Sequence, residues 1–141
     1  LLRDAGAAVN QATQKGFTPL FIACQKGHLE IVQLLLEASA AINQAAGRGF
    51  RPLHVACQEG HPAVVRCLLR AGAETAARTS GGRTARQWAK EEGHGECVKI
   101  FSEEAERREA AAREAKRAEI EAKVARAVAE RAAAERVEAE R

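Results

Sequence analysis

Apolar residues recur along the first hundred positions of this chain with a period of 33 residues. Phe17 aligns with Phe50 and then with Arg83, and residues 17–49 match residues 50–82 at 14 of 33 positions. The third copy is more divergent and retains Thr84, Ala89, Gly93, His94 and Val98. A period of this length predicts a solenoid, in which each unit buries its apolar face by stacking on its neighbours.

The pattern within one repeat predicts two short antiparallel helices. Thr18 is placed to cap the first helix, which begins at Pro19, a position where the missing proline N–H is tolerated. Gly27 ends this helix, because a residue without Cβ readily adopts positive φ. The apolar face of the second helix consists of Leu29, Ile31, Val32, Leu34, Leu35 and Leu36. The polar segment 43–49 is predicted to be a loop that leads to the next repeat.

These repeated residues resemble the ankyrin repeat family. The family's Thr-Pro-Leu-His-x-Ala stretch corresponds to residues 18–23 and 51–56. Its Gly-His pair occurs three times, at 27–28, 60–61 and 93–94. The glycine of its helix-ending Gly-Ala tract is present as Gly72 and is replaced by Ser39 in the first full repeat.

The resemblance implies an all-α ankyrin-repeat solenoid, with helix-turn-helix repeats and hairpin loops, over residues 1–101. Its expected parts are a partial repeat at 1–16, repeats at 17–49 and 50–82, and a degenerate terminal repeat from 83. In the terminal repeat Arg86 stands where the family has leucine. This substitution is typical of a last repeat whose outer side faces water.

Residues 102–141 are expected to form a long charged C-terminal α-helix. They contain no glycine or proline, 14 alanines, 11 acidic residues and 10 basic residues, and such a composition favours helix. Ile120, Val124 and Val128 are four residues apart, but charged residues occupy the later core positions of a heptad seam. We therefore expect an exposed spacer helix. A weak coiled coil that permits oligomerisation and a partner-docking helix stay open as alternatives.

In ankyrin solenoids, partners usually lie across a concave surface built by the loop tips and the exposed side of each first helix. Carried over position by position, the resemblance implies partner-binding candidates in each repeat. The first repeat contributes Gln14, Lys15, Phe17, Phe21, Gln25 and Lys26. The second contributes Arg48, Phe50, Arg51, His54, Gln58 and Glu59. The third contributes Arg78, Ser80, Arg83, Glu91 and Glu92. For Phe21, packing in the core is the alternative.

The net charge of +3 does not by itself identify a nucleic-acid binder. The loop segments, however, hold six cations and no acidic residue: Lys15, Arg48, Arg51, Arg78, Arg83 and Arg86. On the first helices the trend reverses towards Glu91 and Glu92 in the third repeat. We expect a graded groove whose basic loop edge attracts an acidic partner segment. A chance solvated rim is the alternative.

Histidine recurs at positions 28, 61 and 94, which raises the question of a metal site. Neighbouring repeats would not bring three ligands around one ion tetrahedrally, and no acidic residue repeats in phase. We expect turn histidines that hydrogen-bond the backbone, and no metal or cofactor.

Cys24 and Cys57 share one core position of the first helix, and Cys67 and Cys97 align with apolar residues of the other repeats. All four are therefore expected to be buried small hydrophobes rather than nucleophiles. Trp88 aligns with Ile22 and Val55 and is expected to pack in the core. The glycines at 81 and 82 lack the lysine-serine ending of a phosphate-binding loop, which argues against a nucleotide site.

The sequence therefore predicts a non-catalytic protein–protein interaction module with a spacer or docking helix. Two alternatives remain: a basic-rim binder of nucleic acid or anionic lipid, and a regulatory fragment of a larger enzyme. The chain contains no run of 18 apolar residues and no secretory signal at its first residues. An intracellular location, cytoplasmic or nuclear, is the expectation.

Overall fold

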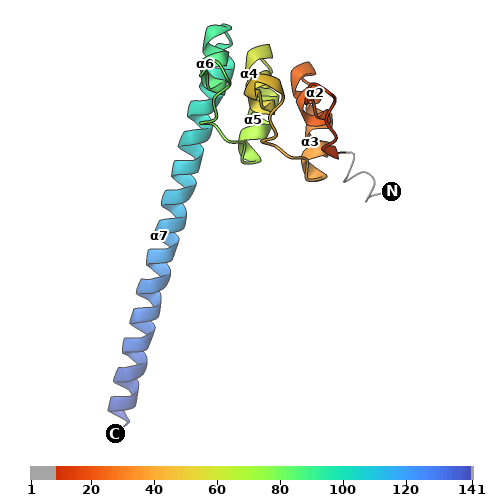
Figure 1. The fold of residues 1–141 in the computed structure, drawn as a ribbon. Helices are drawn as coiled ribbons and strands as arrows, with labels where there is room; N and C mark the ends of the chain where they lie inside the picture. The colour runs from red at the N-terminus through yellow and green to blue at the C-terminus, as the bar shows by residue number, and fades with distance from the viewer. Residues whose placement is uncertain (1–8, 141) are drawn as a thin grey trace. The chain divides into compact units, whose positions relative to one another are not determined.

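The computed structural model describes residues 9–140 and shows an all-α chain. Its elements are α2 (Pro19–Lys26), α3 (Leu29–Glu37), the 3-10 turn η1 (Gly47–Gly49), α4 (Pro52–Glu59), α5 (Pro62–Arg70), α6 (Ala85–Glu91) and α7 (Gly95–Ala139). Figure 1 shows successive helix pairs in the expected order. The described residues contain one isolated β-bridge, between Arg78 and Thr84. Half of the partial repeat expected at 1–16, namely residues 1–8, lies outside the described residues.

The repeats stack through both of their helices. Along the row of first helices, α4 packs on α2 and α6 packs on α4, while α3 packs on α5 in the second row. Buried side chains from successive repeats form one continuous apolar core, which includes Leu20, Val32, Leu53, Val65 and Ile100. Each repeat thus covers much of the apolar face of its neighbour, as the period of 33 residues predicts. Ile31 and Leu34 are exceptions: the sequence placed them on the apolar face of α3, but they are 47% and 63% exposed.

The predicted helix ends are confirmed. The Thr18 hydroxyl accepts a hydrogen bond from the Phe21 amide at 3.1 Å, which satisfies one of the unpaired amides of the first turn. Gly27 ends α2 with φ 73°. Ser39 takes the same left-handed region, at φ 65°, where the next repeat has Gly72 at φ 92°.

Main-chain hydrogen bonds close the hairpin loops and join each loop to the next. The amides of Thr13, Ala46 and Thr79 each donate to the carbonyl four residues later, at 3.0, 2.6 and 2.9 Å. Between loops, the Gly47 amide donates to the Lys15 carbonyl and the Ser80 amide donates to the Arg48 carbonyl. The loop tips are therefore fixed to one another by the backbone, whatever side chains they carry.

The third repeat and the C-terminal extension share one helix. The chain divides into two compact units, Leu1–Glu104 and Ala105–Arg141, and α7 continues from the first unit into the second. The predicted helical nature of the extension is confirmed, and the helix begins earlier than predicted, at Gly95 instead of Ser102.

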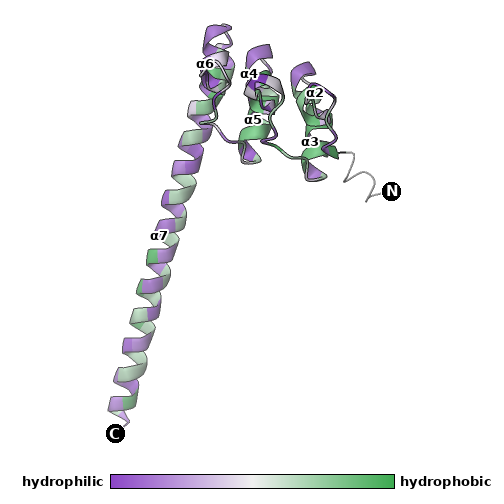
Figure 2. Ribbon diagram, viewed as in Figure 1, coloured by the Kyte–Doolittle hydropathy of each residue, from purple (hydrophilic) through white to green (hydrophobic). Residues whose placement is uncertain are grey.

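The second unit presents its side chains to solvent. Ile120, Val124 and Val128 are 55%, 57% and 62% exposed, and Figure 2 shows hydrophilic and hydrophobic positions mixed along this part of α7. An ion pair joins Lys123 to Glu119, one turn apart, at 3.5 Å. Such a pair stabilises a helix by about 0.2–0.5 kcal/mol. None of the helices within residues 9–140 is long and apolar enough to cross a membrane.

Candidate functional site

A hollow of about 490 Å³ lies between the hairpin loops and the first helices of the repeats. We call it the aromatic groove. It is lined by Phe17, Phe21, Gln25, Gly47, Arg48, Phe50, Val55, Gln58, Thr79, Ser80, Gly81, Arg83 and Trp88. Residues from three successive repeats contribute to it, so the groove exists only because the repeats stack.

Aromatic rings form much of the groove wall. The chain has five aromatic residues, and four of them line the groove. Phe17 stacks on Phe21 with ring centroids 5.0 Å apart, and Phe50 lies 5.2 Å from Trp88. These surfaces can hold an apolar side chain of another molecule by burial and ring contact.

The loop edge of the groove is less uniformly basic than the sequence indicates. The guanidinium of Arg83 lies 5.1 Å above the Trp88 ring and pairs with Glu91 at 2.6 Å. Arg51 pairs with Glu74. These two carboxylates come from outside the three loop segments, and they partly neutralise the expected row of cations. In the third repeat, the basic loop edge and the acidic first helix are therefore not electrostatically separate, because Arg83 of the loop pairs with Glu91 of the helix.

Arg48 keeps its charge unpaired at the groove. It is exposed, and it makes no ion pair with any residue of the described part of the chain. Its backbone has φ 64°, a left-handed conformation that is uncommon for a residue with a side chain. The Arg48 carbonyl accepts the bond from Ser80 that joins two loops, so a structural role accounts for this conformation.

His54 departs from the sequence-based expectation. It was expected to face a partner, but its side chain is only 1% exposed. Its Nδ1 accepts a hydrogen bond from the Arg51 amide at 3.0 Å, and its Nε2–H donates to the Ala77 carbonyl at 2.9 Å. Burial lowers the pKa of His54, and the nearby Arg51 charge lowers it further, while the bond to Ala77 acts in the opposite direction. His54 therefore braces the loop from inside and presents almost none of its side chain at the surface.

The structure divides the seventeen candidates named from the sequence into two sets. Those that line the aromatic groove are Phe17, Phe21, Gln25, Arg48, Phe50, Gln58, Ser80 and Arg83. Those that do not are Gln14, Lys15, Lys26, Arg51, His54, Glu59, Arg78, Glu91 and Glu92. Phe21 lines the groove although it is mostly buried. The role of the first set in binding stays a prediction.

Sequence reasoning missed Trp88 and Thr79 as groove residues. Trp88 packs against the core as expected, but it is only half-buried and its other side faces the groove. Val55, the aligned residue of the second repeat, also lines the groove. This position of the first helix therefore borders both the core and the groove. Within the described chain, the Trp88 Nε1 and the Thr79 hydroxyl are buried without a hydrogen-bond partner.

The recurring histidines join neighbouring repeats. Nε2–H of His61 donates to the Gln25 carbonyl, and Nε2–H of His94 donates to the Gln58 carbonyl, each at 3.0 Å. The prediction that they hydrogen-bond the backbone is confirmed for these two. The residues that the structure describes contain no group of three potential metal ligands.

Three of the four cysteines are buried as expected, and Cys67 is not. Cys24, Cys57 and Cys97 are buried, and Cys67 is partly exposed. Burial, with a smaller contribution from Cys67, raises the pKa of the Cys24 thiol to about 12. A protonated thiol is a poor nucleophile, so the buried cysteines suit packing better than catalysis.

Comparison with known proteins identifies the repeat. A family model described as ankyrin repeats, three copies, matches residues 1–79. Ankyrin repeat domain-containing protein 63 of Homo sapiens is 53% identical over 36 residues, which are 26% of this chain and 10% of that protein. Its Mus musculus counterpart is also 53% identical over 36 residues, which are 9% of its length. The chain matches about a tenth of the length of these curated relatives.

Proposed function

This chain belongs to the ankyrin repeat family, and we propose that it is a non-catalytic module that binds a partner protein across the aromatic groove. Ankyrin repeats are generally protein-interaction modules. We place the binding site in the hollow between the loop tips and the first helices. We expect the partner to carry an acidic segment.

The concentration of aromatic residues carries the proposal. Four of the five aromatic side chains of a chain poor in aromatics line one open hollow. Phe17, Phe50 and Trp88 each remain partly exposed there. Aromatic residues are enriched at the centres of protein interfaces, where they supply most of the binding energy. Stability of the solenoid alone would favour burying these rings completely.

The charges at the loop tips support an acidic partner. Arg48 lines the groove, and Lys15 lies on the neighbouring loop. Both are exposed and make no ion pair with the described residues. Unpaired cations beside an apolar surface attract carboxylates and steer their approach. A partner segment that places an apolar side chain in the groove and an acidic residue beside Arg48 would satisfy both features.

The absence of a catalytic role is part of the proposal. The groove contains no cysteine or histidine among its lining residues, and the raised pKa of Cys24 disfavours a thiolate. We also propose an intracellular setting, cytoplasmic or nuclear, because thiols at packing positions suit a reducing compartment. The extension is proposed to act as a spacer, since its apolar residues do not form a continuous seam.

Site-specific photocrosslinking tests the groove. A benzoylphenylalanine introduced at Gln58, inside the groove, should capture a partner that the same probe at Ala63, an exposed residue of α5, does not capture. Phe17→Ala should reduce capture from Gln58, with Trp88 fluorescence verifying that the variant is folded. Equal capture from both positions, or capture unaffected by Phe17→Ala, would contradict the proposal.

Charge reversal tests the acidic segment with the partner captured in this way. Arg48→Glu should weaken binding about tenfold, since an attraction is replaced by a repulsion of similar size. Arg113→Glu is the matched control, because Arg113 is exposed on the extension and the net charge changes equally. If both variants bind like the unmodified chain, the partner does not use the basic loop edge.

A further inference from the structure

The outer side of the third repeat differs from the same side of the first two repeats. Leu20 and Leu53 are almost completely buried, on α2 and α4. The aligned residue on α6 is Arg86, which is exposed. Similarly, Lys90 is exposed where the buried Cys24 and Cys57 stand in the earlier repeats. Two core positions of the repeat have thus become cationic at the end of the stack.

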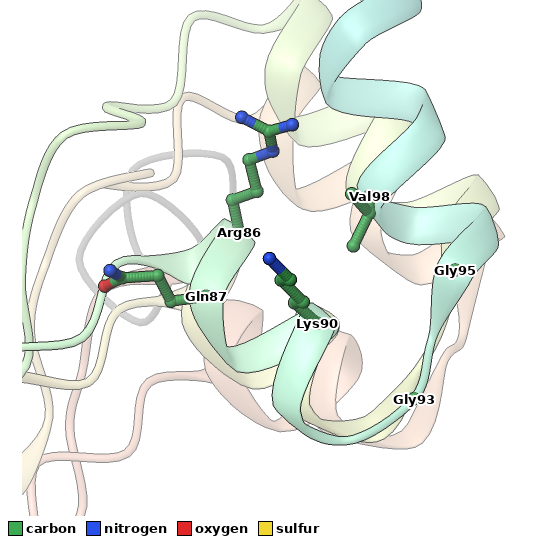
Figure 3. Close-up of a pocket in the computed structure, with 6 residues that line it drawn as sticks. All are labelled: Arg86, Gln87, Lys90, Gly93, Gly95 and Val98. Carbon is green, nitrogen blue, oxygen red and sulfur yellow. The ribbon is translucent and has the colours of Figure 1, made fainter.

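These residues border a hollow of about 500 Å³ between α6 and the start of α7, which we call the end pocket. It is lined by Arg86, Gln87, Lys90, Gly93, Gly95 and Val98. Figure 3 shows Arg86, Lys90 and Val98 around this hollow, with Val98 on the opposite helix. A Cβ atom added at Gly93 or Gly95 would meet no atom within 4 Å, so the connecting turn leaves the pocket open.

The charge of the end pocket is not balanced by its neighbours. Arg86 and Lys90 lie one helical turn apart, where like charges repel, and neither makes an ion pair with a residue between 9 and 140. The adjacent Glu91 is paired with Arg83 on the groove side. The pocket residue Gln87 uses its side-chain oxygen to accept the Thr84 amide. The two exposed cations are therefore available to an anionic group of another molecule.

The first two repeats indicate which kind of element would fit on the outer face of α6. In the first two repeats, the first helix receives a helix on its following side, because α4 packs on α2 and α6 packs on α4. No described helix takes the corresponding place on α6. The stacking surface is continuous with two interfaces that each accommodate a helix, and Val98 continues the apolar positions of Val32 and Val65.

We propose that the end pocket docks an acidic helix of a partner protein. Carboxylates on one face of this helix pair with Arg86 and Lys90, and small apolar residues of the same face contact Val98. A guanidinium binds a carboxylate through two parallel hydrogen bonds, which would fix the orientation of the helix. This surface is separate from the aromatic groove, so the proposal stands or fails independently of the function proposed above.

Fluorescence anisotropy with designed helical peptides tests the proposal on the full chain. The probe is a labelled alanine-based helix with glutamates four residues apart on one face, and its matched control carries glutamines there. The glutamate peptide should bind at least about tenfold more tightly than the glutamine peptide. Arg86→Glu combined with Lys90→Glu should abolish this preference, and the doubly substituted chain should instead bind a lysine version of the peptide.

A matched protein control separates the pocket from overall charge. Arg113→Glu with Arg117→Glu changes the net charge by the same amount on the extension and should leave glutamate-peptide binding unchanged. The proposal is overturned if both double variants lose binding equally or if the glutamine peptide binds as well. It is also overturned if millimolar inorganic phosphate displaces the peptide completely, which would indicate a small-anion site. Concentration-dependent dimers lost in the Arg86→Glu, Lys90→Glu chain would likewise overturn it, because a second copy would then cover the face.

Discussion

The imidazole of His61 lies against Gly27 of the preceding repeat, so closely that a Cβ atom at position 27 would come within 2.6 Å of the ring. His94 stands in the same relation to Gly60, at 2.5 Å. Each of these histidines also donates a hydrogen bond to a backbone carbonyl of the repeat before it. The recurring Gly-His pair therefore has two functions: its glycine ends one helix and receives the histidine of the next repeat.

Replacement of Gly27 by alanine should separate these functions. The added Cβ would meet the His61 ring and would also strain a backbone at φ 73°, so we expect a loss of about 2–4 kcal/mol in the free energy of unfolding. Gly93→Ala is the control, because residue 93 has φ 78° but open space around it, and strain alone amounts to about 1–2 kcal/mol. Urea denaturation followed by Trp88 fluorescence measures both. Equal losses would show that the histidine contact contributes nothing.

The stability of the solenoid should fall in mild acid because of His54. Its pKa is lowered in the folded chain, so below its ordinary value of 6.5 the unfolded state binds more protons and unfolding is favoured. Protonation of Nδ1 would also remove the acceptor of the Arg51 amide. Melting curves between pH 7.5 and about pH 5 should show a decline that is smaller in His54→Gln. His28→Gln, at an exposed position, should behave like the unmodified chain.

Ser39 should be replaceable by glycine with a gain in stability. A serine at φ 65° is strained, and removing the side chain should raise the free energy of unfolding by about 0.5–1 kcal/mol, after the extra flexibility of glycine in the unfolded state is counted. The reciprocal change, Gly72→Ser, should reduce it, since residue 72 has φ 92°. Urea denaturation of both variants measures the pair of effects. A stabilised Gly72→Ser chain would contradict this explanation.

The cysteines should react with iodoacetamide in an order set by burial. Cys67 is partly exposed and should be alkylated first. Cys24, whose pKa is raised to about 12, and Cys57, whose pKa is raised further, should react only through opening of the stack. Mass spectrometry of time points at about pH 8, close to the ordinary pKa of a thiol, measures the order. Denaturation in urea should make all four rates similar, and a Cys57 that reacts as fast as Cys67 would refute the assignment.

Much of the fold could be predicted from local sequence features. Thr18, Pro19 and Gly27 delimit a helix by capping chemistry that involves only neighbouring residues. The 33-residue period then predicts how such helices stack, because similar units repeat the same contact. The helical extension followed in the same way from its alanine content and the lack of glycine and proline.

The groove residues were harder to predict, because alignment between repeats assigns one role to each position. His54 was expected at the surface, yet bonds to Arg51 and Ala77 bury it within the loop. Trp88 was expected in the core, yet its large side chain both packs against the core and lines the groove. The pairing of Arg83 with Glu91 joins residues eight positions apart, which the charge of each segment does not reveal.

The amino-acid sequence alone determined the family, the repeat period, the helix ends and the helical nature of the extension, since these depend on neighbouring residues or on repetition. Only the tertiary structure decided which side chains share a surface. The gathering of four aromatic rings from three repeats, and the conversion of two core positions into the cationic end pocket, depend on how the helices pack. Packing brings together residues that are distant along the chain, and no local pattern specifies their contacts.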